Sequence, residues 1–163
     1  MTFEKLSSDN SEKIELMSKI ATEIVRKHYD PILGKAQNDY MLEKFQSPQA
    51  IKDQLEHGYN YYFIVENDRY IGFTAFFPRG DHMYISKLYL YENERGKGYS
   101  KEALKFISEE TEKLGLRAIE LNANKHNPSC DIYKHLGFII DRAEKNDIGC
   151  GYFMDDFVFR LEI

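Results

Sequence analysis

Residues 85–100 read ISKLYLYENERGKGYS, and the organisation of the whole chain depends on this stretch. From Ile85 onward, its first part carries aliphatic residues separated by tyrosine, lysine and serine, which is typical of a β-strand. Its second part contains Gly96 and Gly98, and we expect a helix to begin at about Lys97. Glycine leaves the backbone bare, and free N–H groups at a helix N-terminus bind anions. The stretch therefore predicts a strand, a tight turn with an anion site, and a helix.

Positive charge at the turn strengthens the prediction of an anion site. Arg95 and Lys97 stand on either side of Gly96, so a phosphate or a pyrophosphate is the expected ligand. The turn is not a P-loop, because the pattern Gly-x-x-x-x-Gly-Lys-Ser/Thr is absent. It is not the dinucleotide fingerprint either, since Lys101 stands where the third glycine would be. The remaining alternative is a plain strand-to-helix connection in which the glycines only ease the turn.

Two segments resemble motifs of the GCN5-related N-acetyltransferase (GNAT) superfamily. Residues 95–100, RGKGYS, resemble its acyl-CoA motif Arg/Gln-x-x-Gly-x-Gly/Ala, with Ser100 in the last small position. Residues 133–138, YKHLGF, resemble its Tyr-x-x-Leu-Gly-Phe segment and begin 33 residues after Ser100. A helix and a strand are expected between the two motifs, as in the superfamily. The N-terminal third of the chain matches the superfamily by its pattern of elements rather than by a motif.

Hydrophobic periodicity places the other elements. Asp9 is the expected N-cap of a long helix that should end before Pro31, because the residue before proline is pushed out of the helical region. Further strands are expected at 2–6, 59–65, 70–77, 117–123, 138–141 and 152–163, and further helices at 38–45, 47–58, 98–114 and 127–135. Together with the resemblance, this order predicts a single α/β (α+β) domain over residues 1–163. Its sheet would be GNAT-type, mixed and mostly antiparallel, with six to seven strands flanked by helices.

Composition excludes several classes of protein. The net charge of −5 argues against nucleic acid as a partner, and 42% hydrophobic with 30% charged residues is typical of a globular domain. The longest apolar run, at 71–77, is too short to span a membrane, and the first residues do not resemble a signal peptide. Cys130 and Cys150 are expected to be free thiols in a reducing compartment. These observations predict a cytoplasmic protein that binds neither nucleic acid nor membranes.

The resemblance implies acetyl-CoA as co-substrate. It implies that backbone N–H groups in the turn hold the pyrophosphate. It also implies that the strand at 88–90 pairs with the two amides of pantetheine and splays away from the strand at 117–123. An asparagine near position 127 contacts the cofactor in many relatives, and Asn122, Asn124, Lys134 and His135 are further candidates. The implied cofactor-binding residues are Leu88, Tyr89, Leu90, Arg95, Gly96, Lys97, Gly98, Tyr99, Ser100 and Asn127.

The resemblance also implies that Tyr133 lies near the thioester sulfur. A phenol with a pKa near 10 is protonated at neutral pH and can give its proton to the departing thiolate. Position alone favours a core tyrosine, and the match of the two motifs favours the acid role. Many relatives carry a glutamate where this chain has Ser86, so the base is open. Candidates are Glu120, Asp155, Asp156, backbone carbonyls and water, although such carboxylates are more often solvated or capping.

The acceptor is expected to be a small-molecule amine, because tyrosines can receive an ammonium group by cation–π contact. The region that builds the acceptor pocket in the superfamily contains His28, Tyr29, Asp30, Tyr40, Tyr59 and Tyr61. The layout is similar to that of bacterial polyamine (spermidine/spermine) acetyltransferases. A lysine- or N-terminus-directed protein acetyltransferase and a non-catalytic acyl-CoA-binding domain are the alternatives. The histidines show no metal-ligand spacing, so no metal is expected. Exposed strand edges and a phenylalanine-rich last strand are compatible with a homodimer.

Overall fold

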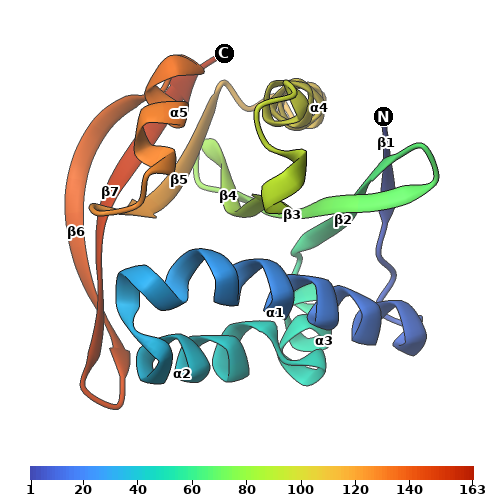
Figure 1. Cartoon of the computed structure of the whole chain (residues 1–163). Coiled ribbons are helices and arrows are strands. Elements are labelled where there is room, and N and C mark those ends of the chain that lie inside the picture. Colours follow the sequence, from blue (N-terminus) through green and yellow to red (C-terminus); the bar gives the residue numbers. More distant parts are fainter. The chain divides into compact units, whose positions relative to one another are not determined.

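The computed structural model describes residues Met1–Ile163 and contains a seven-stranded sheet flanked by five α-helices (Figure 1). The strand order is β1-β2-β3-β4-β5-β7-β6. The pair β4–β5 is parallel, whereas β1–β2, β2–β3, β5–β7 and β6–β7 are antiparallel. The predicted fold class, a mixed and mostly antiparallel sheet of six to seven strands flanked by helices, is therefore confirmed.

The strands are β1 (Thr2–Lys5), β2 (Asn60–Glu66), β3 (Arg69–Arg79), β4 (His82–Leu90), β5 (Ala118–Asn124), β6 (Ile139–Gly149) and β7 (Tyr152–Glu162). The helices are α1 (Ser11–Leu33), α2 (Lys35–Gln46), α3 (Pro48–Glu56), α4 (Tyr99–Lys113) and α5 (Ser129–His135), with a 3₁₀ turn, η1, at Glu92–Glu94. The chain forms two compact units, Met1–Phe77 with Lys87–Ser100, and Pro78–Ser86 with Lys101–Ile163. Strand β4 contributes its first half to the second unit and its second half to the first. No helix is both long and apolar enough to cross a membrane.

The first unit has its core between α1, α3 and the strands β2 and β3. Met17, Ile51, Phe63 and Phe73 are fully buried in one cluster there. The N-cap of α1 is Asn10, whose side chain accepts a hydrogen bond from the Lys13 N–H at 3.1 Å. The expectation that Asp9 is the N-cap was wrong. The Asp9 carboxylate instead accepts a hydrogen bond from the Ser7 hydroxyl.

Helix α1 continues through Pro31 to Leu33, so the expected end before the proline was wrong. Pro31 lies in the last turn of α1, where its missing N–H removes only one intrahelical hydrogen bond. The helix ends at Gly34, with φ 85°, whose N–H donates to the Asp30 carbonyl at 3.0 Å. Glycine adopts a positive φ without strain, and such a residue commonly ends a helix.

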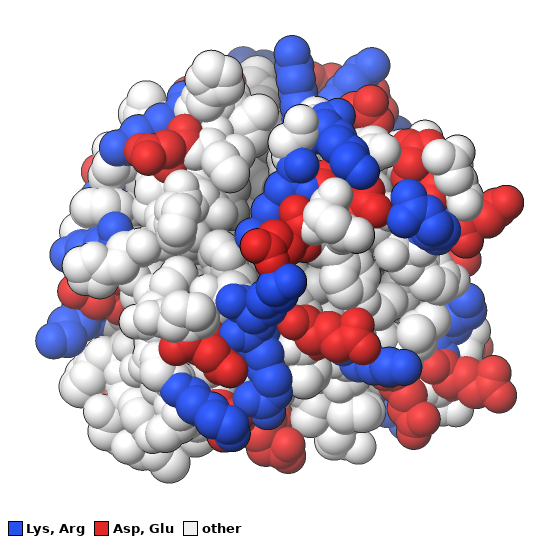
Figure 2. All heavy atoms as spheres, in the orientation of Figure 1, with Lys and Arg blue, Asp and Glu red and all other residues white.

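The second unit contains the β6–β7 hairpin, which is the largest departure from the predicted elements. Strand β6 was expected to end at Asp141 but continues to Gly149 in register with β7. Its polar, mostly exposed sequence has no alternating pattern, and register shifts at Ile140–Arg142 and Asp147–Gly149 interrupt the pairing. Charged side chains of both signs are interspersed on the face of the molecule shown in Figure 2, in keeping with the small net charge.

Gly72 lies where β3 passes closest to β4. A Cβ atom at this position would lie 2.2 Å from the Tyr89 carbonyl oxygen and 2.9 Å from a methyl carbon of Leu90. Backbone cannot yield as a flexible side chain does, so we expect Gly72→Ala to reduce the free energy of unfolding by about 3 kcal/mol, measured by urea denaturation. Gly80→Ala is the control, since φ is +63° there but the space is open. A Gly72→Ala cost no larger than that of Gly80→Ala would contradict the steric argument.

Candidate active site

The turn after β4 has the backbone that an anion site needs. Gly96 and Gly98 adopt φ values of 77° and 83°, in the left-handed region where side chains are strained. No heavy atom lies within 4 Å of a Cβ atom placed at either glycine, so the space next to the turn is open there. Helix α4 begins at Tyr99 rather than at Lys97, because Gly98 is not helical. The first N–H groups of α4, which have no intrahelical acceptor, follow the turn directly.

Glu94 anchors this turn and was missed from the sequence. Its side chain is 3% exposed and accepts hydrogen bonds from Arg69 Nη1 at 3.0 Å and from Lys97 Nζ at 3.2 Å. The Lys97 ammonium, followed by the Arg69 guanidinium, lowers the pKa of this carboxyl group. Lys97 is therefore paired within the protein, whereas Arg95 is exposed beside a hollow of about 580 Å³. The spacing of Glu94 and Lys97, three residues apart, is the signal that could have indicated the pair.

The second half of β4 is held by its side chains and by β3. Leu90 is buried, and Tyr89 packs on Phe73 with ring centroids 5.6 Å apart. The hydroxyl of Thr74 donates to the Lys87 carbonyl at 2.8 Å. Leu88 is half-buried. The segment at 88–90 is thus fixed in the first unit, and pairing of its backbone with pantetheine stays a prediction.

Two of the tyrosines expected to receive a substrate ammonium group, Tyr61 and Tyr29, are buried in the fold. Tyr61 is fully buried, and its hydroxyl donates to Gln54 Oε1 at 2.5 Å. The ammonium over its ring belongs to Lys87, whose Nζ lies 5.5 Å from the Tyr61 centroid and 5.7 Å from that of Tyr59. Although Lys87 is half-buried, the loss of hydration lowers its pKa to about 7. Tyr29 is also buried, beside Tyr89, so the expectation for Tyr61 and Tyr29 was wrong.

Tyr133 lies on α5 in the second unit. Its ring packs against Phe138 and Phe159, with centroid distances of 6.1 and 5.6 Å, and the side chain is half-buried. Asn127 is buried, and its side-chain Oδ1 accepts a hydrogen bond from the Ser129 N–H at 2.9 Å, next to the first turn of α5. A contact between Asn127 and a cofactor remains a prediction.

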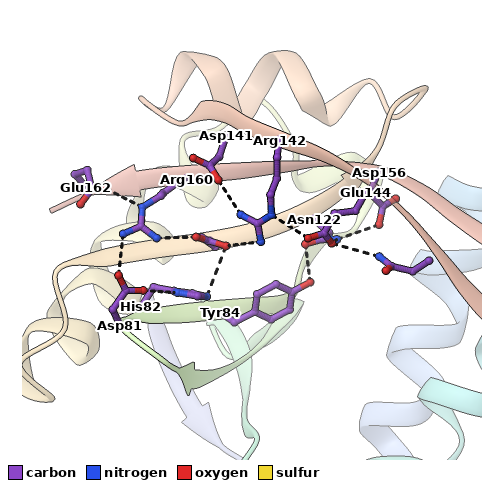
Figure 3. A network of polar contacts seen from close by, with 12 residues as sticks. Asp81, His82, Tyr84, Asn122, Asp141, Arg142, Glu144, Asp156, Arg160 and Glu162 are labelled. Carbon is purple, nitrogen blue, oxygen red and sulfur yellow. Dashed lines mark hydrogen bonds and ion pairs between the residues drawn. The ribbon is translucent and has the colours of Figure 1, made fainter.

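A polar network crosses β5, β6 and β7 of the second unit (Figure 3). At one end, Glu120 is buried and accepts from Arg160 Nη1 at 2.6 Å and from Arg142 Nη2 at 3.4 Å. His82 Nε2 lies 3.6 Å from the same carboxylate. Asp155 is half-exposed and pairs with Lys125 at 3.1 Å. Two of the three carboxylates considered as bases are therefore occupied by cations.

The other end of the network contains the third carboxylate, Asp156. Asn122 Nδ2 donates to Asp156 Oδ2 at 3.3 Å and to Glu144 Oε2 at 3.4 Å. The Tyr84 hydroxyl donates to Asn122 Oδ1 at 3.0 Å. Burial, followed by the charges of Asp155 and Glu144, raises the pKa of Asp156 to about 6, although the hydrogen bond from Asn122 opposes the shift. Asn122, a further candidate for the cofactor, joins two carboxylates here, and a contact with the cofactor stays a prediction.

A second hollow, of about 370 Å³, lies between α4 and the end of α5. Three of its lining residues can carry positive charge, namely Lys101, Lys105 and His135. Its other lining residues are Leu104, Ser108 and Leu136. A cluster of three such groups around a concave surface suits a phosphate, and His135 is the residue of this cluster that the sequence had suggested.

The family of the chain follows from its sequence. A model of the acetyltransferase (GNAT) family matches residues 22–138, which include both the glycine turn and the Tyr133 segment. The chain belongs to the GNAT acetyltransferase family. No curated protein sequence matches it at a significant level.

Solved structures of other acetyltransferases share the fold. The PaiA N-acetyltransferase of Thermoplasma acidophilum in complex with coenzyme A has a TM-score of 0.79, 17% identity and 100% coverage of each chain. A GNAT acetyltransferase of Elizabethkingia anophelis with acetyl-CoA bound has a TM-score of 0.66, 16% identity, and coverage of 99% of this chain and 97% of the other. The ribosomal-protein-S18-alanine N-acetyltransferase of Escherichia coli has a TM-score of 0.67, 16% identity, and coverage of 99% and 93%.

Proposed function

We propose that this GNAT protein transfers an acetyl group from acetyl-CoA to a primary amine by direct attack. The observation that carries the proposal is the turn at 95–98, where two left-handed glycines lead into α4 under open space. Such a turn offers several backbone N–H groups to one anion, as a pyrophosphate requires. Two of the structural neighbours contain coenzyme A or acetyl-CoA, which supports the same ligand here.

The pantetheine arm and the adenosine end of the cofactor would lie against two further parts of the chain. The backbone of Leu88, Tyr89 and Leu90 would pair with the pantetheine amides as an added strand does. The parallel ladder between β4 and β5 runs through Met83, Tyr84 and Ile85, upstream of this segment. The hollow lined by Lys101, Lys105 and His135 would receive a phosphate of the adenosine end. We also propose that residues 1–163 act as a single acetyltransferase domain.

In the proposed reaction the amine attacks the thioester directly, and Tyr133 protonates the thiolate that leaves. A covalent acetyl–cysteine intermediate is not part of the proposal. Burial raises the pKa of the Cys130 thiol, and its Sγ donates a hydrogen bond to the Asn124 carbonyl at 3.4 Å. A protonated, buried thiol is a poor nucleophile. Cys150 is exposed in the β6–β7 turn.

The acceptor proposed is a small cationic amine, for which a polyamine is the working example. The carboxylates of the Figure 3 network support a cationic acceptor rather than an anionic one. A lysine or N-terminal amine of a protein is the alternative, and two neighbours, the S18-alanine enzyme and NAA60 of Arabidopsis thaliana with a bisubstrate analogue, keep it open. A cytoplasmic location and a homodimer remain predictions.

Gly98→Asp tests the cofactor site. A carboxylate at this position would repel the pyrophosphate, and the side chain would be strained at a φ of 83°. We expect the affinity for acetyl-CoA, measured by calorimetry, to fall at least ~100-fold, which is about 3 kcal/mol. The matched control is Gly80→Asp, which places the same charge and strain in open space at the β3–β4 turn. The control should bind acetyl-CoA like the wild-type protein.

The same preparation tests the reaction. Release of free thiol from acetyl-CoA is followed with spermidine, kanamycin and a lysine peptide as acceptors. Release with spermidine or kanamycin supports the small-amine proposal, and release with the peptide alone would favour the protein-directed alternative. Equal acetyl-CoA binding by the wild-type protein and Gly98→Asp would remove the basis of the proposed cofactor site. Binding without any release would indicate the non-catalytic alternative.

A further inference from the structure

We propose that the Asp156 carboxylate receives the ammonium group of the acceptor and takes its proton before the amine attacks. This inference rests on the proposed function and names the base that the sequence left open. It is carried by the position of Asp156 in the sheet, by an unused oxygen atom of its carboxylate, and by the absence of a cation beside it.

Asp156 lies in a row of three polar residues, one on each of β5, β7 and β6. The row lies at the C-terminal end of β5, the end that leads to α5. Asp156 stands opposite Asn124 of β5 on one side and opposite Glu144 of β6 on the other. The Asn124 carbonyl accepts a hydrogen bond from Cys130 of α5, the helix that carries Tyr133. The row therefore lies at the same end of the second unit as the helix of the proposed acid.

The carboxylate of Asp156 is buried but incompletely used. Its side chain is 3% exposed, and Oδ2 accepts one long hydrogen bond, from Asn122 Nδ2 at 3.3 Å. Oδ1 is buried and has no hydrogen-bond partner. Buried carboxylate oxygens are nearly always paired, because their desolvation is costly. The buried Oδ1 atom of Asp156 therefore needs a hydrogen-bond donor that the protein itself does not supply.

Neighbouring cations are committed to other carboxylates. Arg142 pairs with Glu144 at 2.9 Å and also contacts Glu120, and Lys125 pairs with Asp155. No lysine or arginine forms an ion pair with Asp156. Among the acidic residues of the network in Figure 3, Asp156 thus combines burial, an unused oxygen and no cationic partner. An ammonium group with its three donors would complete this carboxylate, and it matches the acceptor class already proposed.

The protons of the reaction balance with two groups. The acceptor ammonium gives one proton to Asp156, which leaves a neutral amine whose lone pair forms the C–N bond at the thioester carbonyl. The C–S bond breaks, and the thiolate takes a proton from Tyr133. The nitrogen then loses its second proton, which restores Tyr133, and Asp156 returns its own proton to solvent. The products are the acetamide, coenzyme A and one proton.

The charged neighbours of Asp156 define an expected pH dependence. Asn122 and Asn124 of β5 are neutral, and the Cys130 thiol of α5 is protonated because burial raises its pKa. Burial alone would raise the pKa of Glu144 of β6. Hydrogen bonds from Asn146, Arg142 and Asn122 outweigh burial, so the pKa of Glu144 is lowered. Asp155 of β7 is half-exposed and paired with Lys125.

Burial raises the pKa of Asp156 to about 6, so this carboxylate changes charge close to that pH. Ionised Asp156 is required to take the proton, so kcat/KM for the amine should fall about tenfold per pH unit below pH 6.

Asp156→Asn and Asp155→Asn form a matched pair, since each removes one negative charge from adjacent positions of β7. With coenzyme A saturating, binding of spermidine and of kanamycin is measured by calorimetry at pH 7.5, and kcat/KM is measured from pH 5 to 8. We expect Asp156→Asn to weaken amine binding at least tenfold, to lower kcat/KM at least 100-fold, and to remove the decline below pH 6. Asp155→Asn should match the wild-type protein in amine binding and in kcat/KM at pH 7.5. It should keep the acidic decline but move it slightly to lower pH, because the charge of Asp155 contributes to the raised pKa of Asp156.

Three results would overturn the inference: no binding of either amine by the wild-type protein, wild-type-like amine binding by Asp156→Asn, or an acidic decline that persists in Asp156→Asn. The proposed function fails on a different observation, which is the absence of thiol release by a wild-type protein that binds acetyl-CoA. Amine binding by the two variants decides the role of Asp156 in that case as well.

Discussion

Tyr133→Phe is expected to lower kcat for acetyl transfer by roughly 10²–10⁴-fold, the usual effect of a general acid. The phenylalanine ring keeps the packing against Phe138 and Phe159, which are 6.1 and 5.6 Å away between centroids, so the fold should be unaffected. Acetyl-CoA affinity should change by less than about twofold, because the hydroxyl acts on the thiolate that forms only during the reaction. Steady-state thiol release and calorimetry measure the two quantities.

A second acyl donor distinguishes loss of an acid from a general disturbance. An acetyl thioester of a more acidic thiol needs less protonation as it leaves, so it should restore much of the rate of Tyr133→Phe and little of that of Asp156→Asn. Tyr70→Phe is the control, because its hydroxyl contacts Lys13 and Glu4 in the first unit. A Tyr133→Phe rate within about threefold of wild type would show that Tyr133 is a packing residue.

Local conformation explains which parts of the fold the sequence could predict. Gly96, Gly98 and the Asn67–Asp68 turn have positive φ values, and their residue types indicate this directly. The end of α1 was misjudged because proline is tolerated within a last turn, where one lost hydrogen bond is outweighed by packing. The length of strand β6 was underestimated because β6 pairs with β7 along its whole length while most of its side chains face solvent. Pairing of that kind leaves no apolar pattern in the sequence.

The candidate site was predictable where it is continuous in sequence and obscure where it is assembled from separate strands. The glycine turn and the Tyr133 segment are short motifs, whereas Asn122, Glu144 and Asp156 meet only through the pairing of β5, β6 and β7. The same difference explains why the aromatic contacts of Lys87 could not be predicted. Lys87 follows Ser86 in the quoted stretch, but it contacts the rings of Tyr59 and Tyr61, which lie beside and in β2. Residue types alone could not rank Glu120, Asp155 and Asp156 as bases, because their ranking depends on which of them a cation already neutralises.

Asp156→Asn should also stabilise the fold at neutral pH while it impairs the reaction. Burial raises the pKa of Asp156 from 3.8 to about 6 in the folded chain. Between these values the unfolded chain has already released the proton that the folded chain still holds, so wild-type stability falls as the pH rises through this range. Above pH 6 the ionised carboxylate costs about 2–3 kcal/mol, at 1.36 kcal/mol for each pH unit between the two values. The asparagine removes this cost, and its carbonyl oxygen can still accept from Asn122.

We therefore expect urea denaturation at pH 7.5 to give Asp156→Asn a free energy of unfolding about 2–3 kcal/mol above that of the wild-type protein, and about 1 kcal/mol above it at pH 4.5. Asp155→Asn, at a half-exposed ion pair, should change stability by less than about 0.5 kcal/mol at either pH. A gain that is equal at both pH values would mean that the asparagine improves packing rather than relieves a buried charge. A loss at pH 7.5 would mean that the carboxylate holds the network together. A pH-dependent gain in stability together with a loss of turnover is the combination expected of a residue kept for its chemistry, because a structural carboxylate would be retained for the stability that it provides.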